Sequence, residues 1–283
     1  MTKHTPVLLQ QAIDGLNVKP GGRYIDATFG LGGHSREILK KGGNVLAIDW
    51  NDQSNIETRL IASLQDKRLT LIIDNYCNIE KIAKENDFYP ADGILFDLGL
   101  SMEQVAISGR GFSYQKPEEE LDMRINKELK ISASDILNNY TKEELYEIFT
   151  TNAETINIGS VIDAIIRRRR VKKFQKVVDI LKIIDHLEPN FERNRIIKRQ
   201  VFQALRMEVN QELDNIRKAI IGSSKILISG GRLAIISFHQ TEDRLIKMIV
   251  RQLNFTAITK KPITSKVNNY FERSAKLRIY EKN

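Results

Sequence analysis

The sequence predicts an α/β protein in which a Rossmann-like parallel sheet is interrupted by an inserted all-helical domain. Two observations support this class. Between about residues 22 and 97, short apolar segments alternate with helical ones, which is typical of βαβ units. From about residue 109 to 198 this alternation stops and helical patterns dominate, and it resumes after residue 200. We therefore expect a sheet domain in two parts, residues 1–108 and 201–283, and a helical insert at 109–200.

The predicted strands are short apolar runs bounded by turn residues, and the predicted helices have apolar positions three and four residues apart. Strands are expected at 24–28, 44–49, 69–73, 93–97, 231–237 and 276–280. Helices of the sheet domain are expected at 35–41, 55–65, 79–85, 201–221 and 241–253. Helices of the insert are expected at 132–138, 141–150, 160–170 and 174–186, where Thr141-Lys-Glu-Glu144 is a capping-box signature.

Composition excludes several classes of protein. Apolar residues make up 41% of the chain and charged residues 28%, which rules out collagen-like, low-complexity and disordered chains. There is no run of 18 apolar residues and no apolar signal segment at the N-terminus, so we expect a cytoplasmic protein without a membrane partner. Cys77 is the single cysteine, which excludes an internal disulfide. The four histidines lack ligand spacing, so no structural metal is expected: His4, His34, His186 and His239.

Basic residues are concentrated in two segments. Residues 244–283 contain ten basic and two acidic residues, which equals the whole net charge of +8. The segment 167–176, Arg-Arg-Arg-Arg-Val-Lys-Lys-Phe-Gln-Lys, contains seven basic residues in ten. Such clusters favour a polyanionic partner, most often a nucleic acid. The alternative is a solvated helix face with no partner.

A glycine-rich segment between the first strand and the first helix predicts a cofactor site. It reads Asp26-Ala-Thr-Phe-Gly-Leu-Gly-Gly-His34, and Asp49 ends the next strand, where an acid can bind ribose hydroxyls. The third glycine of a dinucleotide fingerprint is missing. Asp26 would repel a pyrophosphate, whereas it could meet an ammonium group. The pattern therefore favours S-adenosyl-L-methionine over a dinucleotide, and a purely structural turn is the alternative.

Two later segments fall at the same edge of the predicted sheet. Asp74-Asn75-Tyr76 follows the third strand, where an aromatic ring could stack on adenine, and Asp97-Leu-Gly-Leu-Ser101 follows the fourth. Ligands of open α/β sheets bind outside the carboxyl ends of the strands. Asp97 is therefore a candidate site residue, with a helix cap as the alternative role.

Motifs spread in order over nearly the whole chain point to a known family. They are His4-Thr-Pro-Val-Leu-Leu9, Asp26–Ser35, Asp97–Ser101, Gly109-Arg-Gly-Phe-Ser113, Leu121-Asp-Met-Arg124, Phe202-Gln-Ala-Leu-Arg206 with Val209-Asn210, Gly230–Ala234, Ile236-Ser-Phe-His239 with Glu242-Asp-Arg244, and Arg273–Arg278. In these motifs the sequence resembles the bacterial small-subunit (16S) rRNA (cytosine-N4)-methyltransferase family, RsmH (formerly MraW). The resemblance implies a class I S-adenosylmethionine-dependent methyltransferase sheet with a helical insert. It also implies methylation of the exocyclic amine of a cytidine in the decoding region of small-subunit ribosomal RNA, either as free RNA or in the small ribosomal subunit.

The resemblance also implies roles for individual residues. Glycines and a histidine of the glycine-rich segment would line the methionine end of the cofactor, an acid would hold the ribose, and an aromatic residue would contact the adenosine where the family usually has Phe. Two further polar residues would complete the cofactor site. In that order, these residues are Gly32, Gly33, His34, Asp49, Tyr76, Asp97 and Gln104.

Three segments depart from the family pattern. The usual Gly-Val-Ser-Ser-x-Gln-Leu-Asp reads Gly99-Leu-Ser-Met-Glu-Gln-Val-Ala106 here, and the usual Ser-Phe-His-Ser-Leu-Glu-Asp-Arg reads Ser237-Phe-His-Gln-Thr-Glu-Asp-Arg244. The segment 150–160 lacks the expected Tyr-Gly-Glu-Glu-like stretch. These changes concern the substrate side more than the cofactor side, so they leave the target and the level of activity open.

Candidate catalytic residues follow from the chemistry of the amine. Many amino methyltransferases place an acid or Asn before Pro-Pro and an aromatic after the fourth strand, and this chain has no such prolines after Asp97. Asp97 could accept a hydrogen bond from the amine, although cofactor contact is its expected role. His239 is a candidate proton acceptor or base contact, with a polar turn residue as the alternative. Glu242, Asp243 and Arg244 could cap and brace the helix that follows.

The helical insert is the candidate substrate-recognition domain, and its basic cluster supplies the candidate RNA contacts. Because side chains on a helix point in all directions, about half of them are expected to touch phosphates. These residues are Arg167, Arg168, Arg169, Arg170, Lys172 and Lys173. Two other functions stay open: an RNA-binding ribosome-assembly factor with a vestigial methyltransferase fold, and a nicotinamide-dependent oxidoreductase.

Overall fold

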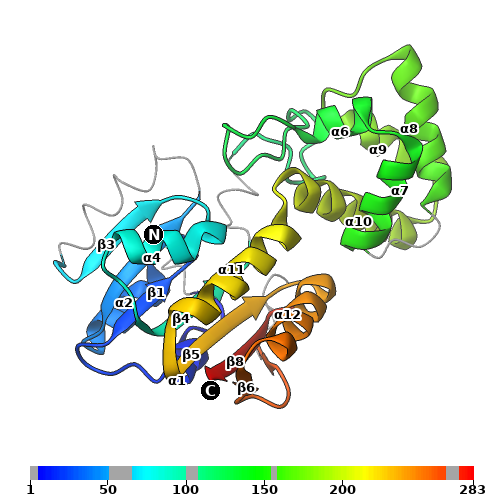
Figure 1. Cartoon of the computed structure of the whole chain (residues 1–283). Coiled ribbons are helices and arrows are strands. Elements are labelled where there is room, and N and C mark those ends of the chain that lie inside the picture. Colours follow the sequence, from blue (N-terminus) through cyan, green and yellow to red (C-terminus); the bar gives the residue numbers. More distant parts are fainter. Residues whose placement is uncertain (1–5, 51–65, 100–107, 154–157, 266–273) are drawn as a thin grey trace. The chain divides into compact units, whose positions relative to one another are not determined.

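The computed structural model describes residues 6–50, 66–99, 108–153, 158–265 and 274–283, which form two compact units (Figure 1). The first unit combines the chain up to Gly99 with Leu213–Asn283, and the second is Leu100–Glu212. Two of the sequence predictions, the helix at 55–65 and the cofactor contact of Gln104, lie outside the described residues.

The first unit contains one sheet with the strand order β3-β2-β1-β4-β5-β8-β6, and β7 pairs with β8. The first five strands of this order run parallel, whereas β8 is antiparallel to β5, β6 and β7. The strands are β1 (Arg23–Asp26), β2 (Asn44–Asp49), β3 (Leu69–Ile73), β4 (Ala91–Asp97), β5 (Leu227–Ser237), β6 (Phe255–Ala257), β7 (Ile263–Thr264) and β8 (Lys276–Lys282). The predicted parallel α/β sheet is confirmed, and the chain's last strand enters it antiparallel.

Helices cover both faces of this sheet, because side chains of a strand alternate between its faces. In β1, Tyr24 packs with α1 (Leu9–Leu16) and α2 (Gly33–Lys40). Its neighbour Ile25 packs instead in the core of the opposite face. The helices on that opposite face are α4 (Ile79–Glu85), α11 (Glu212–Ile226) and α12 (Gln240–Gln252).

The strand order creates a switch point at β1. The chain proceeds from β1 outward to β2 and β3 on one side, whereas β4 and β5 lie on the other side of β1. The loops that leave β1 and β4 therefore diverge at the carboxyl edge, which is where open α/β sheets bind their ligands.

The second unit is helical over its described residues and has its own apolar core, which includes Phe149, Ile162 and Phe202. Among those residues, β pairing is limited to an isolated antiparallel bridge between Glu120 and Lys176. The helices are α6 (Ala133–Asn139), α7 (Lys142–Ala153), α8 (Gly159–Val171), α9 (Val177–Leu187) and α10 (Phe191–Val209). The predicted capping box is present, since Glu144 accepts hydrogen bonds from the backbone and hydroxyl of Thr141 at 2.7 and 2.9 Å.

One predicted element is wrong. The single helix expected at 201–221 is two helices, because α10 ends at Val209 and α11 begins at Glu212. Gln211 between them has a φ of 51°. The side chain of Asn210 caps the break through a local hydrogen bond to the Arg206 carbonyl and two bonds with Met123 and Ile125. The last two are tertiary contacts that periodicity does not reveal.

The boundary expected at residue 200 falls inside α10. The second half of this helix contributes Val201, Phe202 and Leu205 to the core of the helical unit, so that unit extends to Glu212. Four elements were not expected from the sequence: α1, the 3₁₀-helix η1 (Tyr76–Asn78), β6 and β7. All four are short, and α1 begins after Leu8, a residue with positive φ and no side-chain cap.

Candidate active site

The glycine-rich loop between β1 and α2 needs glycine for reasons that lie within the chain. Gly30 and Gly32 have φ values of 53° and 69°, in the left-handed region. A Cβ atom on Gly32 would also collide with the ring of Phe29, whereas one on Gly30 would meet open space. A Cβ on Gly33 would collide with Pro6. The loop is therefore shaped before any ligand binds.

Asp26 holds this loop through hydrogen bonds within the chain and does not face a ligand. Its side chain is fully buried, and it accepts hydrogen bonds from the Ser35 hydroxyl at 2.7 Å and the Thr28 backbone N–H at 3.3 Å. Burial raises the pKa of Asp26 above its ordinary value. This burial does not support the predicted contact between Asp26 and an ammonium group, because each carboxylate oxygen accepts a hydrogen bond from the chain's own turn.

Asp49 joins the ends of two neighbouring strands. Its Oδ2 accepts a hydrogen bond of 2.7 Å from the backbone N–H of Gly30, and the side chain is half-buried. The acid at the end of β2 is therefore fixed against the glycine-rich loop. This is the position from which a carboxylate can accept hydrogen bonds from ribose hydroxyls.

His34 and Asp97 carry buried polar atoms that have no hydrogen-bond partner among the described residues. These atoms are Nε2 of His34 and Oδ1 of Asp97. His34 is 5% exposed and hydrogen-bonds the backbone of Val7. A buried polar atom without a partner is costly, so two in one site indicate a place for polar groups of a ligand.

Electrostatics couple these two residues. Burial raises the pKa of Asp97 to about 6, while the nearby His34 and a hydrogen bond from the Gly99 backbone act in the opposite direction. Burial lowers the pKa of His34, and Asp97 partly offsets that effect. Asp97 is held in place because its backbone N–H donates a 2.6 Å hydrogen bond to the Thr28 hydroxyl.

Tyr76 lies after β3 in the short 3₁₀-helix η1 (Tyr76–Asn78). Its ring packs edge-on against Phe96 of β4, with ring centroids 5.9 Å apart. Asn75 caps the turn by accepting a hydrogen bond from the Cys77 backbone N–H at 2.9 Å. Tyr76 is half-buried at the carboxyl edge, so its ring has a defined position and part of it is accessible.

His239 is the residue that precedes α12. The buried Glu242 accepts hydrogen bonds from the backbone N–H groups of His239 and Phe238 at 3.1 and 2.9 Å. Asp243 pairs with Arg278 of β8 at 2.5 Å. These contacts match the bracing roles expected for Glu242 and Asp243. The imidazole of His239 is half-buried, and its catalytic role stays a prediction.

The basic cluster divides into two groups within the helical unit. Arg168 donates hydrogen bonds to Lys172 and Asp179, and Arg169 donates to the Leu137 and Tyr140 carbonyls at 3.2 and 2.6 Å. Both guanidinium groups therefore hold the helices together. The other four candidates present exposed side chains: Arg167, Arg170, Lys172 and Lys173.

Sequence reasoning missed Thr28 and Ser35, which position Asp97 and Asp26. Both residues lie inside the glycine-rich motif, but the sequence does not indicate which groups their hydroxyls bond. Among the described residues no group of three or more His, Cys, Asp and Glu side chains could hold a metal ion. None of the helices described has the length and apolar character needed to cross a bilayer.

The sheet and its carboxyl edge define a class of protein. The order 3-2-1-4-5 followed by an antiparallel strand distinguishes a class I methyltransferase sheet from the all-parallel dinucleotide-binding sheet. The glycine-rich loop, the acid after β2 and the orphan atoms of His34 and Asp97 fit an S-adenosyl-L-methionine site at that edge. The protein is an S-adenosylmethionine-dependent methyltransferase.

The chain belongs to the MraW methylase family, whose model matches residues 1–283. It is 38% identical to ribosomal RNA small subunit methyltransferase H of Dictyoglomus thermophilum, over 99% of this chain and 96% of that protein. The enzyme of the same name from Cytophaga hutchinsonii is 37% identical, over 96% of this chain and 91% of that protein. A solved rRNA methylase structure from Streptococcus thermophilus covers 100% of this chain and 98% of its own, with 16% identity and a TM-score of 0.46.

Proposed function

We propose that this protein transfers the methyl group of S-adenosyl-L-methionine to the N4 amine of a cytidine in the decoding region of small-subunit ribosomal RNA. The observation that carries the proposal is the family match across all 283 residues, together with relatives named for small-subunit rRNA methylation. The expected partner is this RNA or the small subunit that contains it, and the expected compartment is the cytoplasm.

The cytosine amine is a poor nucleophile because its lone pair is delocalised into the ring. The chain must therefore align the amine with the methyl donor and accept hydrogen bonds from its protons. The cofactor supplies the electrophilic methyl group. The target base must be unpaired or flipped to reach a pocket at a strand edge.

Asp97 is a candidate for accepting an amine hydrogen bond, in addition to its expected contact with the cofactor. Its Oδ1 is buried without a protein partner among the described residues, and its pKa of about 6 lies near the working range of a general base. His239 is the second candidate. It lies just after β5, which pairs with β4 in the sheet. Asp97 of β4 is paired with Ile236 of β5, three residues before His239. Asp49, His34 and Tyr76 would hold the cofactor.

Two assays separate this proposal from its alternatives. Titration with S-adenosyl-L-methionine and with NAD should give binding of the first and none of the second, and the reverse result would favour an oxidoreductase. Labelled methyl groups should then pass from the cofactor to small-subunit particles. Cofactor binding without any transfer to free RNA or particles would favour an assembly factor with a vestigial fold.

A further inference from the structure

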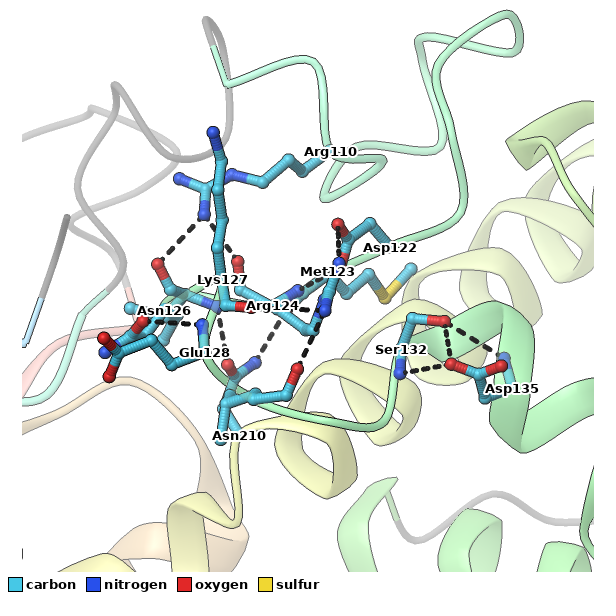
Figure 2. A network of polar contacts seen from close by, with 12 residues as sticks. Arg110, Asp122, Met123, Arg124, Asn126, Lys127, Glu128, Ser132, Asp135 and Asn210 are labelled. Carbon is cyan, nitrogen blue, oxygen red and sulfur yellow. Dashed lines mark hydrogen bonds and ion pairs between the residues drawn. The ribbon is translucent and has the colours of Figure 1, made fainter.

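The helical unit contains a long irregular segment, residues 109–131, between the described start of the unit and α6 (Figure 2). Irregular loops of this length inside compact domains are usually functional. This one includes the motifs Gly109–Ser113 and Leu121–Arg124, to which the methyl-transfer chemistry above assigns no role.

Buried hydrogen bonds hold the segment in one conformation, which includes a strained backbone at Met123. Met123 is fully buried and has a φ of 61°, which is rare for a residue with a side chain. The buried Asn210 accepts a hydrogen bond from the Ile125 N–H and donates one to the Met123 carbonyl, both of 2.8 Å. The Met123 N–H donates to the backbone carbonyl of Arg110. Backbone strain maintained in this way is a frequent feature of binding sites.

Two arginines of the segment have different roles. The guanidinium of Arg124 uses four of its five N–H donors, with Asp122 at 2.6 and 3.0 Å and with the Lys127 and Leu129 carbonyls. Arg110 uses only Nη1, which donates to the Arg124 and Ile125 carbonyls at 2.8 and 3.0 Å. Its Nε and Nη2 atoms have no partner among the described residues, so a positioned guanidinium retains three N–H donors.

Lys127 provides a second cation in the same segment, two residues after Ile125, whose carbonyl accepts a hydrogen bond from Arg110. Its side chain is exposed and has no ion pair among the residues described, and Figure 2 shows its ammonium group extending toward the side of the loop that carries the Arg110 guanidinium. The Arg110 guanidinium also lies 5.9 Å from the ring centre of Phe112, which fixes its direction further. Neither cation has an acidic partner among the described residues. One of them is a positioned guanidinium fork, which is the group that suits bidentate recognition of a phosphodiester.

We propose that Arg110 and Lys127 form a site for a backbone phosphate of the RNA substrate, separate in sequence from the basic cluster 167–173. Asn210 acts as a positioning residue that holds the loop and therefore the site. The inference rests on the proposed function for the identity of the anion. Recognition of a phosphate would fix the position of the RNA and would carry no base specificity.

The test compares two charge-removing changes at neighbouring positions of the full chain, Lys127→Gln and Glu128→Gln. Both side chains are exposed, so both variants should keep the wild-type melting temperature. Lys127→Gln should weaken binding of a small-subunit rRNA fragment about fivefold at 0.1 M salt and reduce the slope of log K against log salt by roughly 0.7. Glu128→Gln should not weaken binding, and the KM for S-adenosyl-L-methionine should not change in either variant.

Three outcomes would overturn the site. One is an unchanged RNA affinity and salt slope in Lys127→Gln, and another is an equal loss in Glu128→Gln, which would indicate a general disturbance of the loop. The third is weaker binding of inorganic phosphate alone, with RNA binding intact. A wild-type protein that binds RNA with the expected slope and transfers no methyl group would instead overturn the proposed function and leave the phosphate site standing.

Discussion

Asp97, a candidate site residue, carries a buried carboxyl oxygen that lowers the stability of the ligand-free fold. Its Oδ1 is inaccessible and lacks a partner among the described residues, so the folded chain disfavours the charged form and the pKa rises to about 6. In the unfolded chain an Asp titrates near ~3.9. The folded protein therefore binds this proton more tightly, and stability is lost as the pH rises from about 4 to 6.

Asp97→Asn should remove that loss. The ligand-free variant is expected to match the wild type in unfolding free energy near pH 4 and to exceed it by about 1–3 kcal/mol above pH 6.5. Urea unfolding at several pH values measures the difference. A variant that is less stable than the wild type at pH 8 would show that Asp97 has a stabilising partner in the free protein.

Asp49 has a structural role, the hydrogen bond with the Gly30 N–H, and a proposed role in cofactor binding, and substitutions can separate the two. Asp49→Ala removes the acceptor of the Gly30 N–H as well as the carboxylate, whereas Asp49→Asn keeps an acceptor oxygen for that N–H. Both variants should bind S-adenosyl-L-methionine at least tenfold more weakly, since charge-assisted hydrogen bonds contribute ~1.5–3 kcal/mol each. The alanine variant should also melt at a lower temperature. Calorimetric titration with unchanged affinity in both variants would remove Asp49 from the cofactor site.

At the scale of elements, the glycine-rich loop offers a matched pair of positions. Gly30 and Gly32 both have positive φ, but only at Gly32 would a Cβ strike the ring of Phe29. Gly30→Ala should cost about 1–2 kcal/mol through its backbone conformation alone. Gly32→Ala should cost more and displace Phe29, and it should weaken cofactor binding further. Equal losses of unfolding free energy in the two variants would show that the Phe29 ring moves aside without loss of stability.

The exposed face of α8 and the turn after it is the other element with a testable role. Replacing Arg167, Arg170 and Lys173 with Gln should weaken RNA binding and reduce the salt slope by roughly 0.7–0.9 for each phosphate left without its cation. Arg169→Gln is the internal control, because that side chain bonds the Leu137 and Tyr140 carbonyls. It should lower stability and leave the slope unchanged. A slope unaffected by the triple change would mean that this face is only solvated.

Element boundaries show what sequence patterns can and cannot predict. The strands at 44–49 and 69–73 and the helix at 79–85 match the structure residue for residue, because apolar runs there end at turn residues. The break at Asn210 was missed, since its cause is a set of hydrogen bonds to Met123 and Ile125, more than 80 residues away.

At the scale of the whole molecule, the arrangement of the sheet followed from the alternation of strands and helices, whereas the antiparallel entry of β8 did not. The helical unit has a core built from its own residues, 112–209, so it is a distinct body in the chain. The strand-end acids of the candidate site were predictable because parallel strands place their carboxyl ends at one edge. The burial and hydrogen bonding of these acids could not be predicted, since the burial of Asp26 and the unpartnered Oδ1 of Asp97 depend on packing.

Nucleoside mass spectrometry tests most directly the proposal that this chain methylates N4 of a cytidine in small-subunit ribosomal RNA. Small-subunit RNA or particles lacking the modification are incubated with the protein and S-adenosyl-L-methionine, digested and analysed. We expect one additional N4-methylcytidine per small-subunit RNA, and none with large-subunit RNA. Methyl groups on another base, on large-subunit RNA or on ribosomal protein, or no transfer to either free RNA or particles, would contradict the account.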